Sequence, residues 1–319
     1  MNDIPDEEIK VEALTDDESE IWERLADYGL HLNHDFPCQV DVLFPVFQGE
    51  ETRGDLRRKT ELLTRLEPTL ENLLLPNERV YYVARGVQQS ALELIFVGAL
   101  WASIINQTVF ILTSLRIVML RCNSRGTPAG VGWVVFYSEI RNIRSRLLGT
   151  LDIQLSDGKR LIFGGFSKVD REAMPEILAE RRQAYQEHGF APECDSSRQN
   201  LCCTCFAVVP DRKYECENCG QLFWRPTELA GRSMLFPAWG DFLMKHYALA
   251  IFECFAGLIS WILALFAIWL GEIGTGFGII LMAHGIDAFA TLIIAFKGHH
   301  PRPARRRRAK NDSFDDDDF

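Results

Sequence analysis

The sequence lacks the features of an exported protein. Its first ten residues, MNDIPDEEIK, are acidic, whereas a secretory signal peptide begins with positive charge and continues into an apolar core. We therefore expect no signal peptide. The sequence also lacks an excess of positive charge, because 34 Lys and Arg face 44 Asp and Glu, for a formal net charge of −10. Nucleic-acid-binding proteins usually carry a basic face, so nucleic acid is not an expected partner.

Residue patterns typical of an enzyme are also missing. Histidines lie at positions 31, 34, 188, 246, 284, 299 and 300, but none is matched with a plausible nucleophile. There is no phosphate-binding loop. We therefore expect a protein without enzymatic activity. The length of 319 residues allows two or three compact units.

The cysteines, in contrast, are concentrated in one short segment. Cys202 and Cys205 form one Cys-x-x-Cys pair, and Cys216 and Cys219 form a second pair. Two such pairs on tight turns supply four thiolates for a tetrahedral Zn²⁺, which predicts a zinc ribbon in a reducing compartment. A closed set of four thiolates leaves no position for water, so the zinc should be structural. Cys203 is the less favoured ligand, and free or disulfide-bonded cysteines are the alternative.

Residues near these cysteines are typical of the turns and the apolar shell of a small metal-binding domain. Gly220 suits the positive φ that such a turn often needs after its last ligand. Ribbons of this kind bind nucleic acid or protein, or only hold a small domain together. The expected apolar shell of the metal consists of Phe206, Tyr214, Leu222, Phe223 and Trp224.

From about residue 78 to residue 165 the pattern is typical of β-strands. Apolar and polar residues alternate within 80–84 and 151–155, and Asp157-Gly158 is a strong hairpin signal. A helix at about 169–187 follows, so we expect a small β-barrel closed by a C-terminal helix. Before this region the sequence predicts helices at about 16–28 and 55–74, with Pro68 kinking or splitting the second, and a short strand near 40–44.

One stretch of this region allows another interpretation. Ala91–Thr113 has 23 residues with few polar groups, which is long enough to span a bilayer. Glu93, Ser103, Asn106 and Gln107 interrupt the stretch. Because its flanks also read as strands, we favour buried strands of the barrel over a membrane span.

The same region resembles a known family. The segments LLLPNERVYYVARG, TVFILTSLRIVML and VVFYSEIRNIRSRLLGTLDIQLSDGKRLIF look like a bacterial pleckstrin-homology-like (PH-like) domain of the YokE-like or GRAM-like kind. That family typically shows Leu-x-Pro-x-Glu, Leu-Thr-x-x-Arg and Tyr-x-x-Ile. The matching residues here are Leu74, Pro76, Glu78, Leu112, Thr113, Arg116, Tyr137 and Ile140. The resemblance covers about residues 70–187 and implies a binding or scaffolding domain without chemistry of its own.

Three arginines in this region are candidates for binding an anionic lipid headgroup. Arg141, Arg144 and Arg146 lie close together in the sequence and could form a weak basic patch. The alternative is that they are solvated charges at the end of a strand, because exposed arginines are common.

Two long apolar segments, Tyr247–Leu270 and Gly274–Phe296, follow the cysteines. Each has the length of a membrane span, and the short link between them makes the two antiparallel. Basic residues precede the first segment and follow the second. This charge bias predicts a multi-pass protein of the cell (inner) membrane with both termini in the cytoplasm. A buried helical pair in a soluble domain is the alternative.

Three ionisable residues interrupt the apolar segments. Glu253 lies in the first, and His284 and Asp287 lie in the second. Ionisable residues inside a span mark functional-site candidates, although His284 and Asp287 could also satisfy one another and join helices. Small residues on the second segment permit close helix contact within the hairpin or between copies in a homo-oligomer. They are Gly274, Gly276, Gly278, Ala283 and Ala290.

These features predict an α+β protein in seven parts. They are an acidic N-terminal helical region (1–69), a PH-like domain (70–187), a linker (188–200), a zinc ribbon (201–226), a connector (227–246), a two-helix transmembrane hairpin (247–296) and a basic then acidic tail (297–319).

The expected function is that of a membrane-anchored, non-enzymatic adaptor whose PH-like domain binds a protein or a lipid. One alternative is a small oligomeric membrane sensor or channel-like protein that uses Glu253, His284 and Asp287. Another is a ribbon that recruits nucleic acid to the membrane.

Overall fold

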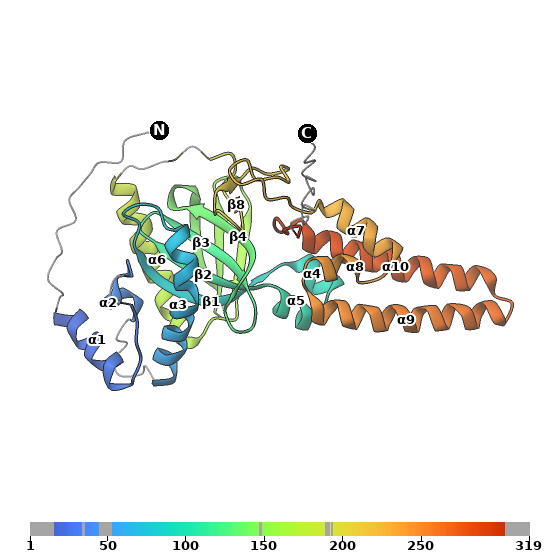
Figure 1. The fold of residues 1–319 in the computed structure, drawn as a ribbon, viewed down its shortest axis with the longest axis horizontal. Helices are drawn as coiled ribbons and strands as arrows, with labels where there is room; N and C mark the ends of the chain where they lie inside the picture. The colour runs from blue at the N-terminus through green and yellow to red at the C-terminus, as the bar shows by residue number, and fades with distance from the viewer. Residues whose placement is uncertain are drawn as a thin grey trace, which may run out of the picture. The chain divides into compact units, whose positions relative to one another are not determined.

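The computed structural model describes residues 16–33, 36–44, 53–146, 149–188, 192 and 194–303 (Figure 1). The predicted acidic N-terminal run and most of the predicted basic and acidic tail lie outside these residues. The chain is an α+β protein that divides into two compact units, Met1–Gln199 and Asn200–Phe319. The boundary falls within the predicted linker.

An antiparallel sheet forms the centre of the first unit. Its strands are hydrogen-bonded in the order β5-β6-β7-β1-β2-β3-β4. Two meanders, β1 to β4 and β5 to β7, are joined where β7 pairs with β1. This order is open, whereas the sequence analysis predicts a small barrel. The bounds are Val80–Gln89 (β1), Gln107–Thr113 (β2), Arg116–Cys122 (β3), Pro128–Phe136 (β4), Ile140–Arg146 (β5), Thr150–Leu155 (β6) and Arg160–Gly164 (β7).

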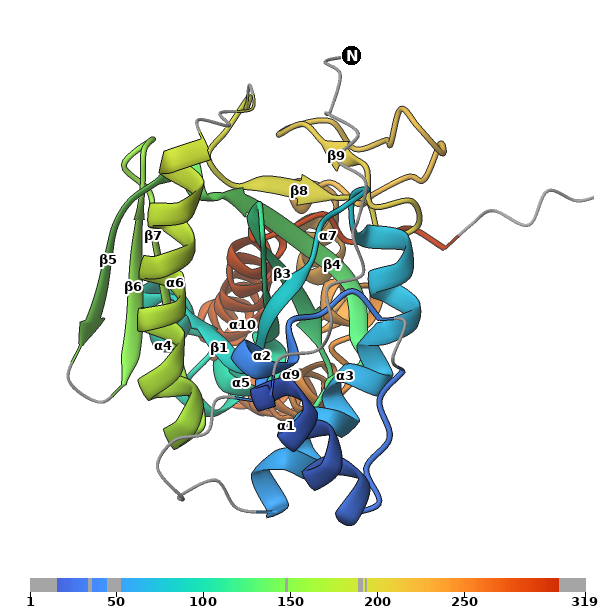
Figure 2. The ribbon, with the colours of Figure 1, turned by 90° about the vertical axis from the view of Figure 1, so that its left-hand side faces the viewer.

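The core of this unit lies between the sheet and α6 (Lys168–His188), which Figure 2 shows crossing in front of the strands. Met174, Ile177, Leu178 and Tyr185 of α6 are buried, as the helical pattern predicts. They pack with inward-facing side chains of the strands, among them Trp133. The predicted closing helix is therefore confirmed. The hairpin between β6 and β7 is also confirmed, with φ of +83° at Gly158.

A buried polar network ties together four of the residues that carry the PH-like resemblance. Arg116 makes two hydrogen bonds to the carboxylate of Glu78, at 2.9 and 2.8 Å. The Thr113 hydroxyl donates to Glu78 at 2.6 Å, and the Tyr137 hydroxyl donates to the Thr113 carbonyl at 2.8 Å. Glu78 is only 1% exposed, so removing either charge would leave the other buried and unpaired, at a cost of about 3–5 kcal/mol.

Three helices precede the sheet: α1 (Asp16–Asp27), α2 (Val40–Leu43) and α3 (Arg53–Leu73). The predicted helices at 16–28 and 55–74 are confirmed, and α3 continues through Pro68 instead of splitting. The strand predicted near 40–44 is wrong. Only Cys38 makes a strand-like bridge, to Val80, and the chain then turns into α2, which buries Val40 and Leu43.

The predicted strands within the stretch 91–113 are only partly present. Two short helices, α4 (Ala91–Phe96) and α5 (Ala99–Ile105), precede β2, and Gly98 separates them with φ of +85°. The polar residues explain the difference, because the Asn106 amide donates to the buried Glu93 carboxylate at 2.5 Å. Glu93 and Asn106 are buried, whereas most of the large apolar residues of α4 and α5 are exposed. Neither helix is long enough to span a membrane.

The second unit contains a short hairpin and four helices. The hairpin strands are β8 (Gln199–Leu201) and β9 (Val208–Val209), and the helices are α7 (Pro226–Leu235), α8 (Trp239–Leu243), α9 (Tyr247–Trp269) and α10 (Ile273–Ala295). Figure 1 shows α9 and α10 as a long antiparallel pair. Gly271 turns the chain between them with φ of +90°.

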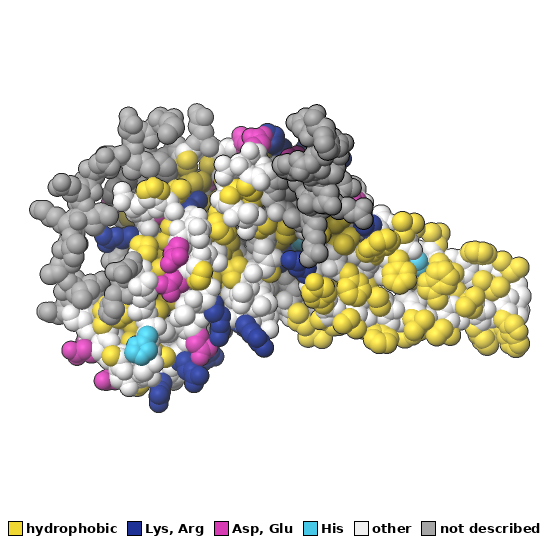
Figure 3. Space-filling view, viewed as in Figure 1, with side chains coloured by type: hydrophobic (Ala, Val, Ile, Leu, Met, Phe, Trp, Pro, Cys, Tyr) yellow, Lys and Arg dark blue, Asp and Glu magenta, His cyan; other side chains and the backbone are white. Residues whose placement is uncertain are grey.

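Both long helices are long and apolar enough to cross a membrane. Only 11% of the apolar window of α9 and 28% of that of α10 is buried. Figure 3 shows hydrophobic side chains over most of the visible face of this hairpin. A core helix of a soluble protein would bury most of these residues, so the exposure favours contact with lipid.

One glycine sets how closely α9 and α10 approach. A Cβ built on Gly276 would lie 2.7 Å from the Ala264 carbonyl oxygen and 2.5 Å from a carbon of Ile268. Gly278, two residues further on, has nothing within 4 Å of the same position. The predicted close contact through small residues is therefore present at Gly276 and absent at Gly278.

This difference gives a matched pair of variants. We expect Gly276→Leu to separate the two helices and to lower the unfolding free energy of the hairpin by about 1–3 kcal/mol, as overpacking does in other tightly packed sites. Gly278→Leu should have little effect. Thermal unfolding of the detergent-solubilised protein measures both, and equal sensitivity of the two variants would contradict the packing described.

Candidate functional site

The four predicted cysteine ligands come together in the second unit. The sulfur atoms of Cys202, Cys205, Cys216 and Cys219 all lie within 4.8 Å of one another. The closest pairs are 3.5 Å apart, between Cys202 and Cys219, and 3.6 Å apart, between Cys205 and Cys216. These distances exceed a disulfide bond but approach the value of about 3.8 Å that four Zn–S bonds of about 2.3 Å impose in a tetrahedron. The four thiols could therefore hold a metal ion.

Two equivalent turns aim these sulfur atoms at one point. In the first turn the Phe206 amide donates to the Cys202 carbonyl at 3.1 Å, and in the second the Gly220 amide donates to the Cys216 carbonyl at 2.8 Å. Gly220 has φ of +70°, as predicted, and Phe206 takes the same left-handed conformation with φ of +55°. The sequence places Phe206 in the apolar shell but does not reveal this conformation, because an aromatic residue rarely adopts a positive φ.

The thiols of the cluster titrate differently. Burial raises the pKa of Cys202. Burial would also raise the pKa of Cys205, but hydrogen bonds involving Asn218 and the Ala207 backbone lower it to about 6. A bound cation would favour the thiolate form of all four cysteines, because it offsets the cost of bringing negative charges together.

The apolar shell differs in part from the predicted one. Phe223 and Tyr214 pack against the cysteines, whereas Leu222 is 45% exposed. His299 adds a contact that the sequence did not reveal. Its ring stacks on Tyr214, with centroids 5.6 Å apart, and its Nε2 lies 2.7 Å from the Lys213 carbonyl oxygen. Cys203 is only partly buried and lies outside the four-sulfur group.

The candidate headgroup arginines do not all lie together. Arg144 and Arg146 line a small cavity of about 190 Å³ on β5, β6 and β7, together with Arg160 and the buried Asp152. Arg141 does not line this cavity, and its carbonyl accepts a hydrogen bond from Arg182.

Asp152 links two of these arginines. It pairs with Arg146 at 2.7 Å and also with Arg160. The hydrogen bond from Arg160 is the main cause that lowers the pKa of Asp152. Sequence reasoning missed Arg160 because it comes from another strand, where it lies opposite Gln154.

Of the predicted polar residues in α9 and α10, His284 and Asp287 are buried and Glu253 is partly buried. His284 places Nδ1 2.8 Å from the Met234 carbonyl oxygen, and its Nε2 accepts from the Trp261 indole at 3.2 Å. Asp287 accepts from the Ala238 amide at 3.0 Å. His284 and Asp287 therefore bond to residues of α9 and of the segment before it, and the alternative in which they satisfy one another does not hold.

Asp241 of α8 is a further buried carboxylate, which sequence reasoning overlooked. It accepts from the Thr291 hydroxyl of α10 at 3.0 Å and lies 3.1 Å from His246. Among the described residues, one oxygen of Glu253 and one of Asp287 are buried without a hydrogen-bond partner.

Comparisons with known proteins give the chain no family. No family model and no curated protein matches the sequence. Among the solved structures that match a part of the chain is the C-terminal domain of an unknown protein from Leishmania infantum. It shares 9% identity, covers 38% of this chain and 94% of that chain, and has a TM-score of 0.26, which is too low to support an argument about fold.

The four-cysteine group generates a direct test. We expect the purified, reduced protein to contain about one zinc per chain. Cys216→Ser should abolish metal binding and destabilise the ribbon, because it removes one of four ligands, whereas the matched Cys203→Ser should retain the metal. Elemental analysis measures both variants, and wild-type protein without metal would contradict the assignment.

Proposed function

We propose that this protein is a membrane-anchored, non-enzymatic adaptor. The observation that carries the proposal is the pair of helices α9 and α10, whose outward surfaces are apolar along their whole length. As an antiparallel pair they would insert as a hairpin in the cell membrane, with both chain ends in the cytoplasm. Lys297 and Arg302 follow α10, which agrees with the positive-inside rule.

The four cysteines would bind Zn²⁺ as a structural ion. All four ligand positions would be taken by thiolates, so no position would remain for a catalytic water. Such a zinc ribbon would stabilise the segment between the first unit and the hairpin, which has only a small apolar cluster of its own.

The first unit would serve as the PH-like binding domain. Two meanders of strands and one C-terminal helix agree with this assignment, and the network around Glu78 supports it because it joins Thr113, Arg116 and Tyr137 of the motifs. The cavity lined by Arg144, Arg146 and Arg160 would offer an anionic headgroup three guanidinium groups.

The helices α4 and α5 would bring the first unit against the bilayer. Their outward side chains are large and apolar: Leu92, Leu94, Ile95, Phe96, Leu100 and Ile104 are all at least 40% exposed. The one acidic residue of this segment, Glu93, is fully buried, so the exposed face of α4 carries no charge that would oppose entry into lipid. A protein anchored by two spans keeps a bilayer within reach of this surface.

A second candidate function is a small oligomeric sensor that responds to protons or cations. The unpartnered oxygens of Glu253 and Asp287, beside Asp241, favour it, because buried carboxylates without cations are costly in a membrane. The adaptor is preferred because His284 bonds to Met234 and Trp261, and Asp241 bonds to Thr291, within the hairpin and the connector.

Lipid photocrosslinking tests the adaptor proposal. A photoreactive benzoyl-phenylalanine replaces Ile95 in α4 or Leu258 in α9. The side chain of Ile95 is 73% exposed and that of Leu258 is 58% exposed. In native membranes both positions should give lipid adducts by mass spectrometry. Leu75, which is 40% exposed and lies after α3, is the matched control and should give none.

The two photoreactive positions test the contact of α4 with the bilayer and the membrane anchor separately. Adducts at Leu258 without adducts at Ile95 would remove the contact between α4 and the bilayer. Protein adducts at Leu258 instead of lipid adducts would contradict the membrane anchor itself.

A further inference from the structure

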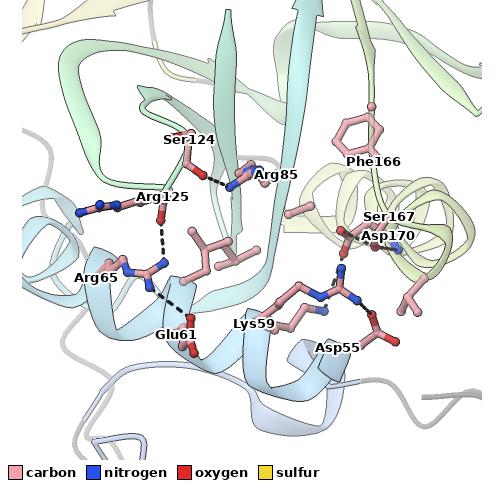
Figure 4. Close-up of a pocket in the computed structure, with 16 residues that line it drawn as sticks. Asp55, Lys59, Glu61, Arg65, Arg85, Ser124, Arg125, Phe166, Ser167 and Asp170 are labelled. Atoms are coloured by element: carbon pink, nitrogen blue, oxygen red, sulfur yellow. Dashed lines mark hydrogen bonds and ion pairs between the residues drawn. The ribbon is translucent and has the colours of Figure 1, made fainter. Parts of the chain in front are cut away.

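A cavity of about 540 Å³ lies in the first unit, apart from the sites above. Figure 4 shows it between α3, β1, the turn after β3 and the loop that leads into α6. Its volume is within the range of about 300–1,000 Å³ that is typical of small-molecule sites. The lining combines five basic with three acidic side chains, in a chain where acidic residues outnumber basic ones overall.

Two arginines from different elements define one end of the cavity. Arg65 of α3 donates to the Arg125 carbonyl at 2.6 Å, and Arg85 of β1 donates to the Ser124 carbonyl at 2.7 Å. Both carbonyls belong to the turn after β3, so neutral acceptors fix the two guanidinium groups near each other (Figure 4). Arg65 also pairs with Glu61 at 3.1 Å, whereas no carboxylate among the described residues lies within ion-pair distance of Arg85.

A buried lysine adds positive charge at the other end. Lys59 is 9% exposed, and its ammonium lies 2.8 Å from the Leu43 carbonyl oxygen and 3.9 Å above the Tyr82 ring. Asp170 is 3.9 Å away, and the hydroxyl groups of Tyr82 and Ser167 already donate to it. The negative charge of Asp170 is therefore shared among several donors.

The wall between these ends is apolar. Phe166 lines the cavity and packs on Phe110, with ring centroids 5.4 Å apart. Gly86 makes room for it, because a Cβ there would lie 2.6 Å from the Phe166 ring. The lining therefore combines the Phe166 ring with the guanidinium groups of Arg65 and Arg85.

We propose that this cavity binds a small soluble anion that joins a phosphate or carboxylate head to an apolar or aromatic body. The head would contact Arg65 and Arg85, because guanidinium groups bind both kinds of oxyanion through paired hydrogen bonds. The body would lie against Phe166 and Leu62. Binding there would couple the ligand to α3 and to the first turn of α6, which both line the cavity.

Calorimetric titration of the full-length, detergent-solubilised protein tests the proposal. The probes are phenyl phosphate, benzoate, inorganic phosphate and the uncharged benzyl alcohol. Phenyl phosphate or benzoate should bind at one site per chain, more tightly than inorganic phosphate, and benzyl alcohol should give no saturable heat. The absence of saturable binding by both aromatic anions at millimolar concentration would overturn the proposal.

Three variants locate the binding. The double variant Arg65→Gln/Arg85→Gln should weaken binding of phenyl phosphate at least tenfold. Val169→Trp fills the cavity without changing its charge and should weaken the binding of phenyl phosphate by a similar factor. If circular dichroism shows that the double variant is misfolded, Val169→Trp alone tests the site. Arg79→Gln removes an exposed arginine that directly precedes β1 and lies outside the cavity. Its affinity for phenyl phosphate should stay within twofold of wild type. Equal loss in Arg79→Gln, or none in Val169→Trp, would contradict the site.

Discussion

The apolar surfaces of α9 and α10 impose a constraint on the whole second unit. Burying apolar area contributes about 25 cal/mol per Å², and here most of that area has no protein to pack against. A helical hairpin in lipid satisfies every backbone group internally, so the side chains can face outward while the polar atoms turn inward. His284 and Asp287 follow this rule, because their partners are the carbonyl of Met234 and the amide of Ala238.

The same two bonds explain why the connector is folded. The chain breaks its helical structure between α7 and α8, where Ala238 has φ of +70° and is fully buried. An irregular segment of this kind needs acceptors and donors from its neighbours. The carboxylate of Asp287 supplies an acceptor, and Thr291 bonds to Asp241 from the same face of α10. The polar residues of α10 thus organise the segment between α7 and α9.

In the first unit, the ion pair between Glu78 and Arg116 joins neighbouring elements in a similar way. Glu78 also accepts from the Leu75 amide at 2.8 Å, and Arg116 donates to the Leu73 carbonyl at 2.9 Å. The pair therefore joins the end of α3 to the turn between β2 and β3. This junction sets the position of α3 over the sheet, and α3 forms one wall of the cavity with Arg65 and Arg85.

The sequence predicts well those features that depend on local spacing. The cysteine pairs, the two long apolar segments, α6 and the hairpin at Gly158 all belong to this class. Prediction fails where a polar residue finds its partner far along the chain. In the sequence Glu93 only interrupts an apolar stretch, whereas in the structure it is buried and accepts a hydrogen bond from Asn106, in a segment of two short helices. His284 and Asp287 were paired by their spacing of three, although their partners lie about fifty residues earlier.

The cavity between α3 and β1 was not predicted for the same reason. Its lining comes from four separate segments, and neither Arg65 nor Arg85 stands out in the sequence. The arginine cluster on β5 was predicted only in part, because Arg160 joins it through strand pairing. Motif and periodicity thus locate elements and metal ligands, whereas binding surfaces require the pairing of strands and the packing of helices.

The orientation of the hairpin is the most direct test of the account. A reporter that is active only in the cytoplasm is attached to residue 1 in one fusion and to residue 319 in another. A hairpin of two spans whose two ends both lie in the cytoplasm requires reporter activity in both fusions. Activity at one end only would mean an odd number of spans and would contradict the membrane hairpin.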